Sequence, residues 1–421
     1  MRHTILVLTS GLAVVVGATP ALAQADLFAR DRNVAVSQRP RPELQALGLR
    51  WGTFMVYPET QLDVGYDDNV TAAETDERSD WLVRLSPSVE LESGWSRHSL
   101  TAYARAAVTR YLDYDRDNTE TWAVGASARG DIQRGSSVQA GFEIARQVEP
   151  RTSSSAPQSL AEPIVFDSRS ANLRATHTFN RLRLIGRLDV RDYDYEDGRL
   201  INGATINQDD RDQTTYEALG RVDYAVSPAT ALYGQVAVNT RSFDATGAAG
   251  TPSRDSEGIN ALAGANFELG DLVRGEVGLG YIEQSFDDPL YGSLSGLSTN
   301  ARLEYFATPL LTLGLTANRA VTDSGIPGSA GILATTVQAT ADYELRRNIL
   351  IGARLGFADE EFDGIDRDNQ RVFGGVRATY LMNRRFGVTA SYDVETRDSS
   401  GLQAVNNFTA NRFLISLVAQ Y

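Results

Sequence analysis

The chain has 421 residues, 54 of them acidic and 40 basic, and a formal net charge of -14 at pH 7. This balance argues against nucleic acid or any other polyanion as a partner, because a negatively charged surface repels it. The sequence has no cysteine, which excludes a disulfide framework and leaves backbone pairing and packing to hold the fold. Hydrophobic residues make up 42%, a value that fits a β-barrel in which only alternate residues meet lipid.

The amino-terminal segment predicts export. A basic start precedes an apolar run over residues 5–17, and Ala-Leu-Ala at 21–23 matches the small-x-small pattern that signal peptidase cuts. We therefore predict a signal peptide over residues 1–23, cleaved near Ala23. No later stretch approaches the ~18 to 20 consecutive apolar residues of a membrane-spanning helix, so any membrane crossing must use strands. Residues 24–50 are polar, and we predict that they form a periplasmic segment outside the barrel.

The rest of the chain, residues 51–421, reads as a succession of strands. Each is long enough to cross a membrane at a tilt, for which ~9 to 11 residues suffice. We predict about 18 strands, at residues 52–66, 81–92, 99–112, 119–132, 137–148, 169–179, 182–195, 214–226, 230–243, 256–268, 272–286, 295–306, 310–322, 332–345, 348–362, 370–382, 386–397 and 408–421.

The connections between these strands alternate in character. Short connections of hairpin composition, such as 180–181 and 346–347, alternate with longer acidic stretches that are rich in Gly and Ser. The longest of these are 149–168 and 196–213. Short turns on one side and long loops on the other predict an all-β fold, a single transmembrane antiparallel up-and-down β-barrel of the outer-membrane type, with its turns in the periplasm.

The two faces of the predicted strands differ in polarity. One face is apolar and carries no charge in the strands with the clearest alternation, whereas the other carries arginines and carboxylates, as a polar lumen requires because charges facing lipid are costly. The residues predicted to line the lumen are Arg105, Arg183, Arg187, Arg191, Arg221, Arg274, Arg302, Arg354, Arg377, Glu217, Glu276 and Glu304. They indicate either a hydrated channel that hydrogen-bonds a polar solute or a set of cross-strand ion pairs.

The carboxy terminus is typical of the closing strand of an outer-membrane barrel. Phe413, Ile415, Leu417 and Tyr421 fall on one face at a period of two, and the chain ends on the aromatic residue. We interpret these four residues as the assembly signal that the barrel-assembly machinery reads. The alternative is a half-buried strand of a soluble β-sandwich.

The segment over residues 39–54, with Tyr57-Pro58 and the stretch 64–70 that follow, resembles the start of the type 2 family of proteobacterial β-barrel porins. The motifs at 85–88 and 93–98 continue the likeness, which extends to the carboxy terminus. The resemblance implies an outer-membrane barrel, and its members are often associated with export of surface polysaccharide. The resemblance also implies partners for the protein, namely outer-membrane lipid and lipopolysaccharide around the barrel and polysaccharide-export components in the periplasm. It supplies no catalytic motif.

Three functional hypotheses follow. The first is a conduit for surface polysaccharide, the second a general diffusion porin for small polar solutes, and the third a non-conducting structural or adhesive barrel. A constriction loop folded into the pore would favour the second, and 149–168 and 196–213 are the best candidates for one. We expect no enzyme and no cofactor, because the mature chain has only two histidines, His98 and His177, from which to build a catalytic or metal site.

Overall fold

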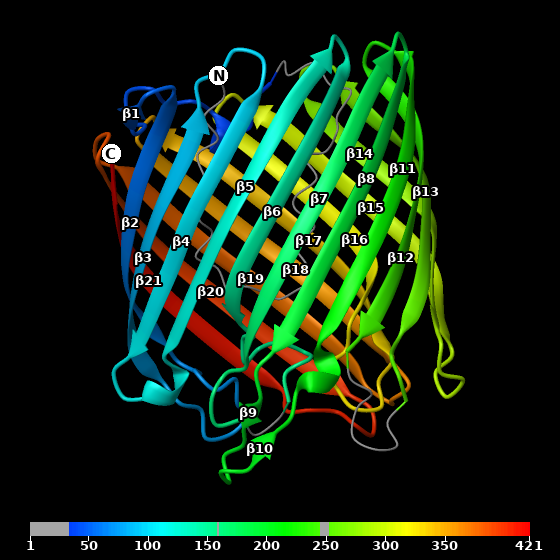
Figure 1. Cartoon of the computed structure of the whole chain (residues 1–421). Coiled ribbons are helices and arrows are strands. Elements are labelled where there is room, and N and C mark those ends of the chain that lie inside the picture. Colours follow the sequence, from blue (N-terminus) through cyan, green and yellow to red (C-terminus); the bar gives the residue numbers. More distant parts are fainter. Residues whose placement is uncertain (1–32, 158–159, 245–251) are drawn as a thin grey trace.

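The computed structural model describes residues 33–157, 160–244 and 252–421, which form one closed antiparallel β-barrel (Figure 1). The predicted signal peptide lies outside the described residues. Eighteen strands make the wall. The first nine are β2 (Phe54–Asp67), β3 (Asp80–Ser93), β4 (Ser99–Tyr111), β5 (Thr119–Gln133), β6 (Ser136–Val148), β7 (Val165–Phe179), β8 (Leu182–Tyr195), β11 (Gln213–Ser227) and β12 (Thr230–Phe243). The other nine are β13 (Ser256–Leu269), β14 (Val273–Phe286), β15 (Ser293–Thr308), β16 (Leu311–Thr322), β17 (Gly331–Arg346), β18 (Ile349–Asp363), β19 (Asp368–Leu381), β20 (Phe386–Ser400) and β21 (Phe408–Gln420).

The predicted strands are confirmed, and their boundaries agree with the structure to within a few residues. The largest difference is at β7, which begins at Val165 rather than at residue 169 because Val165 pairs with Val148 and lengthens the hairpin with β6. Each strand pairs with its neighbour in chain order, and the pairing of β21 with β2 closes the wall. Closure leaves no long unpaired edge.

The wall is apolar outside and polar inside. On β2, Leu62 and Val64 are exposed, whereas Gln61 and Asp63, which alternate with them, are buried. This is the inverse of a soluble β-protein, and it follows from a period of two with lipid on the outer face. Buried apolar clusters in the described part of the chain are small, such as the one around Leu333.

The two ends of the barrel differ. One end carries tight turns, such as that at Asn180, which adopts a φ of 51° between β7 and β8. The other end carries the long loops, with the short β9 (Gly198–Arg199) and β10 (Thr205–Ile206) and the 3-10 turns η2 (Asp115–Asp117) and η3 (Asp209–Arg211). We call them the turn end and the loop end, which in outer-membrane barrels face the periplasm and the exterior. No helix among the described residues is long and apolar enough to span a membrane.

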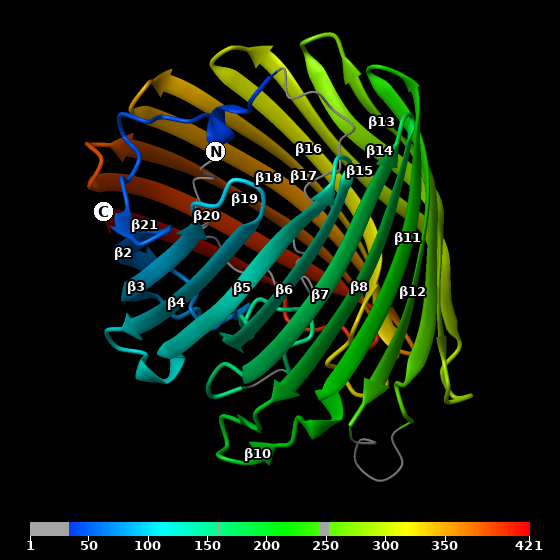
Figure 2. The same ribbon diagram turned by 45° about the horizontal axis from the view of Figure 1, so that its top comes forward.

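Residues 33–48, which we call the N-terminal strap, pack against the inner wall at the turn end (Figure 2). The strap contains η1 (Val36–Gln38), and its Val36 N–H donates to Thr312 Oγ1 at 3.1 Å. The guanidinium of Arg41 is fully buried and bonds Glu344 at 2.8 Å. Thr312 and Glu344 are inward-facing residues of β16 and β17, so the expectation that this segment lies outside the barrel is wrong for residues 33–48. The buried ion pair explains why it is held inside.

The strap leads directly into the seam of the barrel. Gly48 N–H donates to a main-chain oxygen of Tyr421 at 3.1 Å, and β1 (Leu49–Trp51) then pairs with the start of β2. Gly52, with a φ of 61°, allows the tight reversal between these two strands. The first described segment and the last residue of the chain are therefore joined at the turn end.

Candidate functional site

The nine arginines that the sequence predicts for the lumen lie on inward-facing strand positions, and each has a carboxylate within 4.0 Å. The predicted Glu217, Glu276 and Glu304 are among their partners. The pairs are Arg105–Glu143 at 3.0 Å, Arg183–Asp223 at 3.2 Å, Arg187–Asp189 at 2.6 Å, Arg187–Glu217 at 2.5 Å, Arg191–Asp189 at 3.9 Å, Arg221–Glu276 at 2.7 Å, Arg274–Glu304, Arg302–Glu304 at 3.7 Å, Arg354–Asp393 at 2.6 Å and Arg377–Asp342 at 3.8 Å. For these individual residues the structure favours the ion-pair interpretation.

A basic cavity of about 970 Å³ lies on the inner wall of β5–β8 near the turn end. It brings together three of the predicted residues with four further arginines. The charged residues of its lining are Arg97, Arg129, Arg134, Arg174, Arg183, Arg187, Arg191, Asp131 and Asp189. The other predicted arginines lie elsewhere on the wall.

A second charged region is built by the loop between β6 and β7, which folds across the lumen. We call residues 149–164 the crossing loop, of which 158 and 159 are not described. Ser154 Oγ donates to Glu360, Arg367 donates to the carbonyl of Ser154 at 3.0 Å, and Arg397 donates to the carbonyl of Ser153 at 3.4 Å. These partners belong to β18, β20 and the loop before β19, on the far side of the barrel in strand order. The loop therefore spans the lumen at the loop end.

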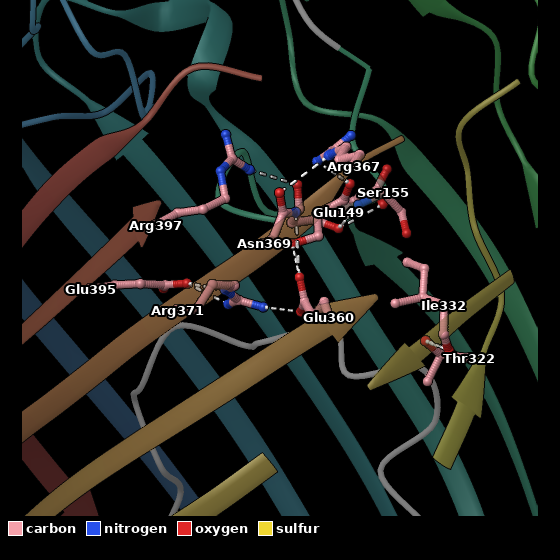
Figure 3. Close-up of polar contacts among 12 residues, drawn as sticks. Glu149, Ser155, Thr322, Ile332, Glu360, Arg367, Asn369, Arg371, Glu395 and Arg397 are labelled. Atoms are coloured by element: carbon pink, nitrogen blue, oxygen red, sulfur yellow. Dashed lines mark hydrogen bonds and ion pairs between the residues drawn. The ribbon is translucent and has the colours of Figure 1, made fainter. Parts of the chain in front are cut away.

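The wall that receives the crossing loop is a buried ionic network, which Figure 3 shows. We call its residues Glu360, Arg367, Arg371, Glu395 and Arg397 the loop-end lock, and each is at most 8% exposed. Arg371 lies between two carboxylates, with Nη1 at 3.1 Å from Glu360 and Nε at 3.0 Å from Glu395. Glu360 and Glu395 therefore share Arg371 as their ion-pair partner.

The other two arginines of the lock have no carboxylate within 4.0 Å among the described residues. Instead, Arg367 stacks on Phe362 at 4.4 Å and Arg397 on Phe408 at 4.7 Å, and both donate to backbone carbonyls of the crossing loop. Burial lowers the pKa of Arg367 to about 10, although the charge of Glu360 opposes the shift. The loop carbonyls, together with Asn369 Oδ1 and the Asn406 carbonyl, therefore solvate two buried cations that form no ion pair with the described residues.

The root of the crossing loop is held by a second buried ion pair. Arg211, next to the start of β11, forms a bidentate pair with Glu149, with both bonds at 2.9 Å. Burial acts to lower the pKa of Arg211, but the charges of Glu149 and Tyr195 outweigh it and leave the pKa raised. A Cβ at Gly325 would lie 2.6 Å from the Ser155 carbonyl oxygen, so this close approach of the β16–β17 loop requires glycine.

Asp212 follows Arg211 and accepts the Tyr195 N–H at 2.6 Å. Burial raises the pKa of Asp212 to about 6, and the charges of Asp194, Asp209 and Asp244 add to the rise, while the Tyr195 hydrogen bond opposes it. A titratable carboxyl therefore lies beside the anchor of the crossing loop.

Sequence reasoning nominated 149–168 and 196–213 as constriction loops, and in the structure residues of both meet through Glu149 and Arg211. It missed the lock. Arg367 and Arg397 could have been noticed as charges near strand ends, but no local signal pairs them with a loop more than 200 residues away.

A serine and a histidine also meet on neighbouring strands. Ser136 Oγ is hydrogen-bonded to His177 Nδ1, and the His177 ring lies edge-on to Phe179. A hydrolytic triad would need a third polar group to orient the imidazole, and within the described ranges no such side chain bonds His177. The same ranges contain no group of three or more His, Cys, Asp or Glu that could hold a metal ion.

The predicted assembly residues lie on the closing strand and at its end. Phe413, Ile415 and Leu417 of β21 are exposed on the outer face, and Tyr421 follows the strand. The residues between them, such as Leu414 and Ser416, are buried. The geometry is that of a lipid-facing strand.

With this geometry in view, comparison with known proteins is informative. The model of the family described as "putative beta-barrel porin 2" matches residues 41–421. The chain belongs to this family. It is accordingly a porin-like β-barrel of the outer membrane. No curated protein matches its sequence.

Several solved outer-membrane barrels are similar in fold. The ferric enterobactin receptor PfeA of Pseudomonas aeruginosa has 9% identity over 86% of this chain and 80% of the receptor, with a TM-score of 0.46. The copper transporter OprC has 10% identity over 89% and 81%, with a TM-score of 0.48. OccK1 (OpdK) of P. aeruginosa has 11% identity over 87% and 99%, with a TM-score of 0.44. These values are too low to carry an argument about function.

Proposed function

We propose that this family member is a diffusion porin for small polar solutes, constricted at its loop end by the crossing loop. The observation that carries the proposal is the span of that loop, from its root at Glu149 and Arg211 to the lock on the opposite wall. An 18-stranded barrel encloses a lumen too wide for its wall side chains to fill. A loop tied down at both ends narrows such a lumen and sets an upper limit on solute size.

Export of surface polysaccharide, which the family resemblance implies, is not supported by the comparisons. A polymer conduit needs an uninterrupted path, and the crossing loop lies in that path. The other alternative is a non-conducting barrel whose loops form an adhesive surface. The basic cavity at the turn end argues against it, because a filled lumen would leave no such space. The same proposal includes cleavage of the signal peptide near Ala23, insertion by the barrel-assembly machinery and contact with lipopolysaccharide.

The proposal is tested by measuring single-channel conductance of the refolded full-length barrel and the uptake of sugars of graded size into liposomes. The test variant combines Arg367→Ala with Arg397→Ala. Because neither arginine has a carboxylate partner in the part of the chain that the structure describes, their removal leaves no buried carboxylate unpaired. We expect higher conductance and a larger size limit, since the crossing loop loses two anchors.

Arg105→Ala is the matched control, because Arg105 is an inward-facing arginine outside both the lock and the basic cavity. It should leave the size limit unchanged. Absence of any conductance in all variants would favour the structural or adhesive barrel. Passage of long polysaccharide through the wild-type barrel, or loss of surface polysaccharide in a strain without the gene, would restore the conduit hypothesis.

A further inference from the structure

The basic cavity carries an excess of positive charge in a chain whose net charge is negative. Seven arginines and two aspartates, Asp131 and Asp189, line this cavity. Two further carboxylates reach its arginines from β11, Asp223 bonding Arg183 and Glu217 bonding Arg187. Seven positive charges against four negative ones leave an excess of three. The ion pairs at this wall therefore do not neutralise it.

The arginines of the cavity form two lines that meet at Arg187. One line runs along β8 through Arg183, Arg187 and Arg191, spaced four residues apart, or about 13 Å at ~3.3 Å per residue. The other runs across the strands: Arg129 is opposite Gln139, Gln139 opposite Arg174, and Arg174 opposite Arg187. The first line leads from the turn end toward the crossing loop.

The direct opposition of Arg174 and Arg187 is not explained by stability. Like charges opposite each other on neighbouring strands are destabilising. Glu217 and Asp189 offset the charge of Arg187, and Arg129 is paired with Asp131 at 2.9 Å, but the lining of the cavity as a whole has seven arginines against four carboxylates. An arrangement that costs stability and faces a cavity is typical of a binding site.

The rim of the cavity adds two arginines that have no carboxylate partner within the described residues. Arg97 donates to the carbonyl of Asp131 at 2.9 Å, and Arg134, in the β5–β6 turn, is exposed. Charges of one sign at the mouth of a cavity raise the local concentration of the opposite ion. The rim therefore attracts anions from the turn end.

We infer that the basic cavity is a binding site for small oxyanions, solutes that carry a carboxylate or a phosphate group. This inference rests on the proposed porin function and names its preferred solute class. The planar guanidinium fork matches the two oxygens of a carboxylate or phosphate, and Arg174 and Arg187 hold one such group from two strands. Arg183 and Arg191 extend the same surface along the axis of the barrel.

The test measures binding by calorimetry on the refolded full-length barrel in detergent, with succinate and inorganic phosphate as separate probes and chloride at equal ionic strength as the reference. The test variant is Arg129→Gln with Arg174→Gln. The matched control is Arg302→Gln with Arg377→Gln, two inward-facing arginines that lie outside the cavity with carboxylates at 3.7 and 3.8 Å. Heat-modifiable mobility establishes that both variants are folded.

We expect the wild type and the control to bind at least one of the two oxyanions more tightly than chloride. The test variant should bind it roughly tenfold more weakly, which corresponds to about 1.4 kcal/mol. Equal binding by all three proteins, or no preference over chloride in the wild type, would overturn the inference. Because calorimetry needs no conductance, a barrel that binds oxyanions without conducting would overturn the porin function alone.

Conductance gives a second measurement on the same proteins. In planar bilayers under a salt gradient, the reversal potential of the wild type and the control should indicate anion preference, and that of the test variant should shift toward cations. A shift of equal size in the control would show that the selectivity belongs to the whole lumen and not to the cavity.

Discussion

The loop-end lock and the basic cavity are both rich in arginine, yet their arginines have different surroundings. In the lock, Arg367, Arg371 and Arg397 are at most 3% exposed, and they donate to Glu360, Glu395 and the backbone of the crossing loop. In the cavity, the side chains of the paired arginines are more exposed, from 11% at Arg183 to 46% at Arg129. Buried charged side chains hold chain segments together through ion pairs and hydrogen bonds. Hydrated charged side chains remain accessible to a solute.

The comparison presupposes a closed wall, so the largest effect should come from breaking the closing strand. Phe413→Asp places a charge on the lipid-facing side of β21, and deletion of Tyr421 removes the terminal aromatic residue. We expect both variants to accumulate as unfolded periplasmic protein, measured by heat-modifiable mobility and protease digestion. Leu402→Asp, in a loop where the side chain is 90% exposed, is the control for the added charge. Normal barrels from both variants would contradict the assignment of this strand.

The next largest effect should separate the two regions directly. Arg371→Leu leaves Glu360 and Glu395 buried without their shared partner, which should lower the free energy of unfolding by about 3–5 kcal/mol. Arg129→Leu removes a half-exposed pair with Asp131 and should cost only ~0–1 kcal/mol. Urea midpoints of the refolded barrels measure both. Equal midpoint shifts would mean that the two regions do not differ in the way described.

This contrast also decides which arginines of the cavity are suitable for substitution. Changing Arg183, Arg187 and Arg191 together to Glu would leave the fully buried Asp223 and the half-buried Glu217 facing new carboxylates. The resulting repulsion would disturb folding. A change in ion selectivity could then not be attributed to the arginines. Arg129 is the cleaner position, because its partner Asp131 keeps 42% of its side chain exposed.

The strap at the turn end offers a smaller effect. Glu344→Ala removes the partner of Arg41 and Arg39, so the strap should detach and residues 33–48 should be cut faster by protease. The barrel itself should stay folded. Glu43→Gln, which removes an exposed pair with Arg347, is the control and should leave the rate of cleavage unchanged. Cleavage at the same rate in all proteins would contradict the docking of the strap.

The smallest effect concerns pH at the loop end. Since the pKa of Asp212 is raised to about 6 in the folded chain, folding favours its protonated form. The stability of this region should therefore fall as the pH rises from about 4 to 6 and level off above. Protection factors of the crossing loop, which are exchange rates corrected for the intrinsic pH dependence of amide exchange, should be larger at pH 5 than at pH 7.5, and Asp212→Asn should remove the difference. Smaller protection factors at pH 5 would contradict the sign.

The sequence predicted the strands well, for a physical reason. A strand in a barrel wall meets lipid on one side and the lumen on the other, so the alternation of Leu62, Asp63 and Val64 on β2 is enough to assign each face. The same argument assigns the predicted lumen arginines to the inner face.

Alternation assigns a face but not a partner, and this is why the rest was not predicted. Ser154 meets Glu360 across 206 residues of sequence, and Arg41 meets Glu344 across 303. Such contacts depend on how an 18-stranded wall curves back on itself, which no local pattern contains. The polar composition of residues 24–50 predicted a periplasmic segment outside the barrel, and composition alone could not show that Arg41 would be buried against Glu344.

The strap also constrains the order of events during insertion. Its arginine Arg41 can be buried only when β17, which carries Glu344, is already in place, and Gly48 can bond only to a chain that extends to Tyr421. Contacts of such sequence separation form late, because the closure entropy of the intervening chain must be overcome first. Resistance of residues 33–48 to proteolysis therefore indicates that the barrel is complete. A chain stalled before its last strands would leave this segment open to periplasmic proteases.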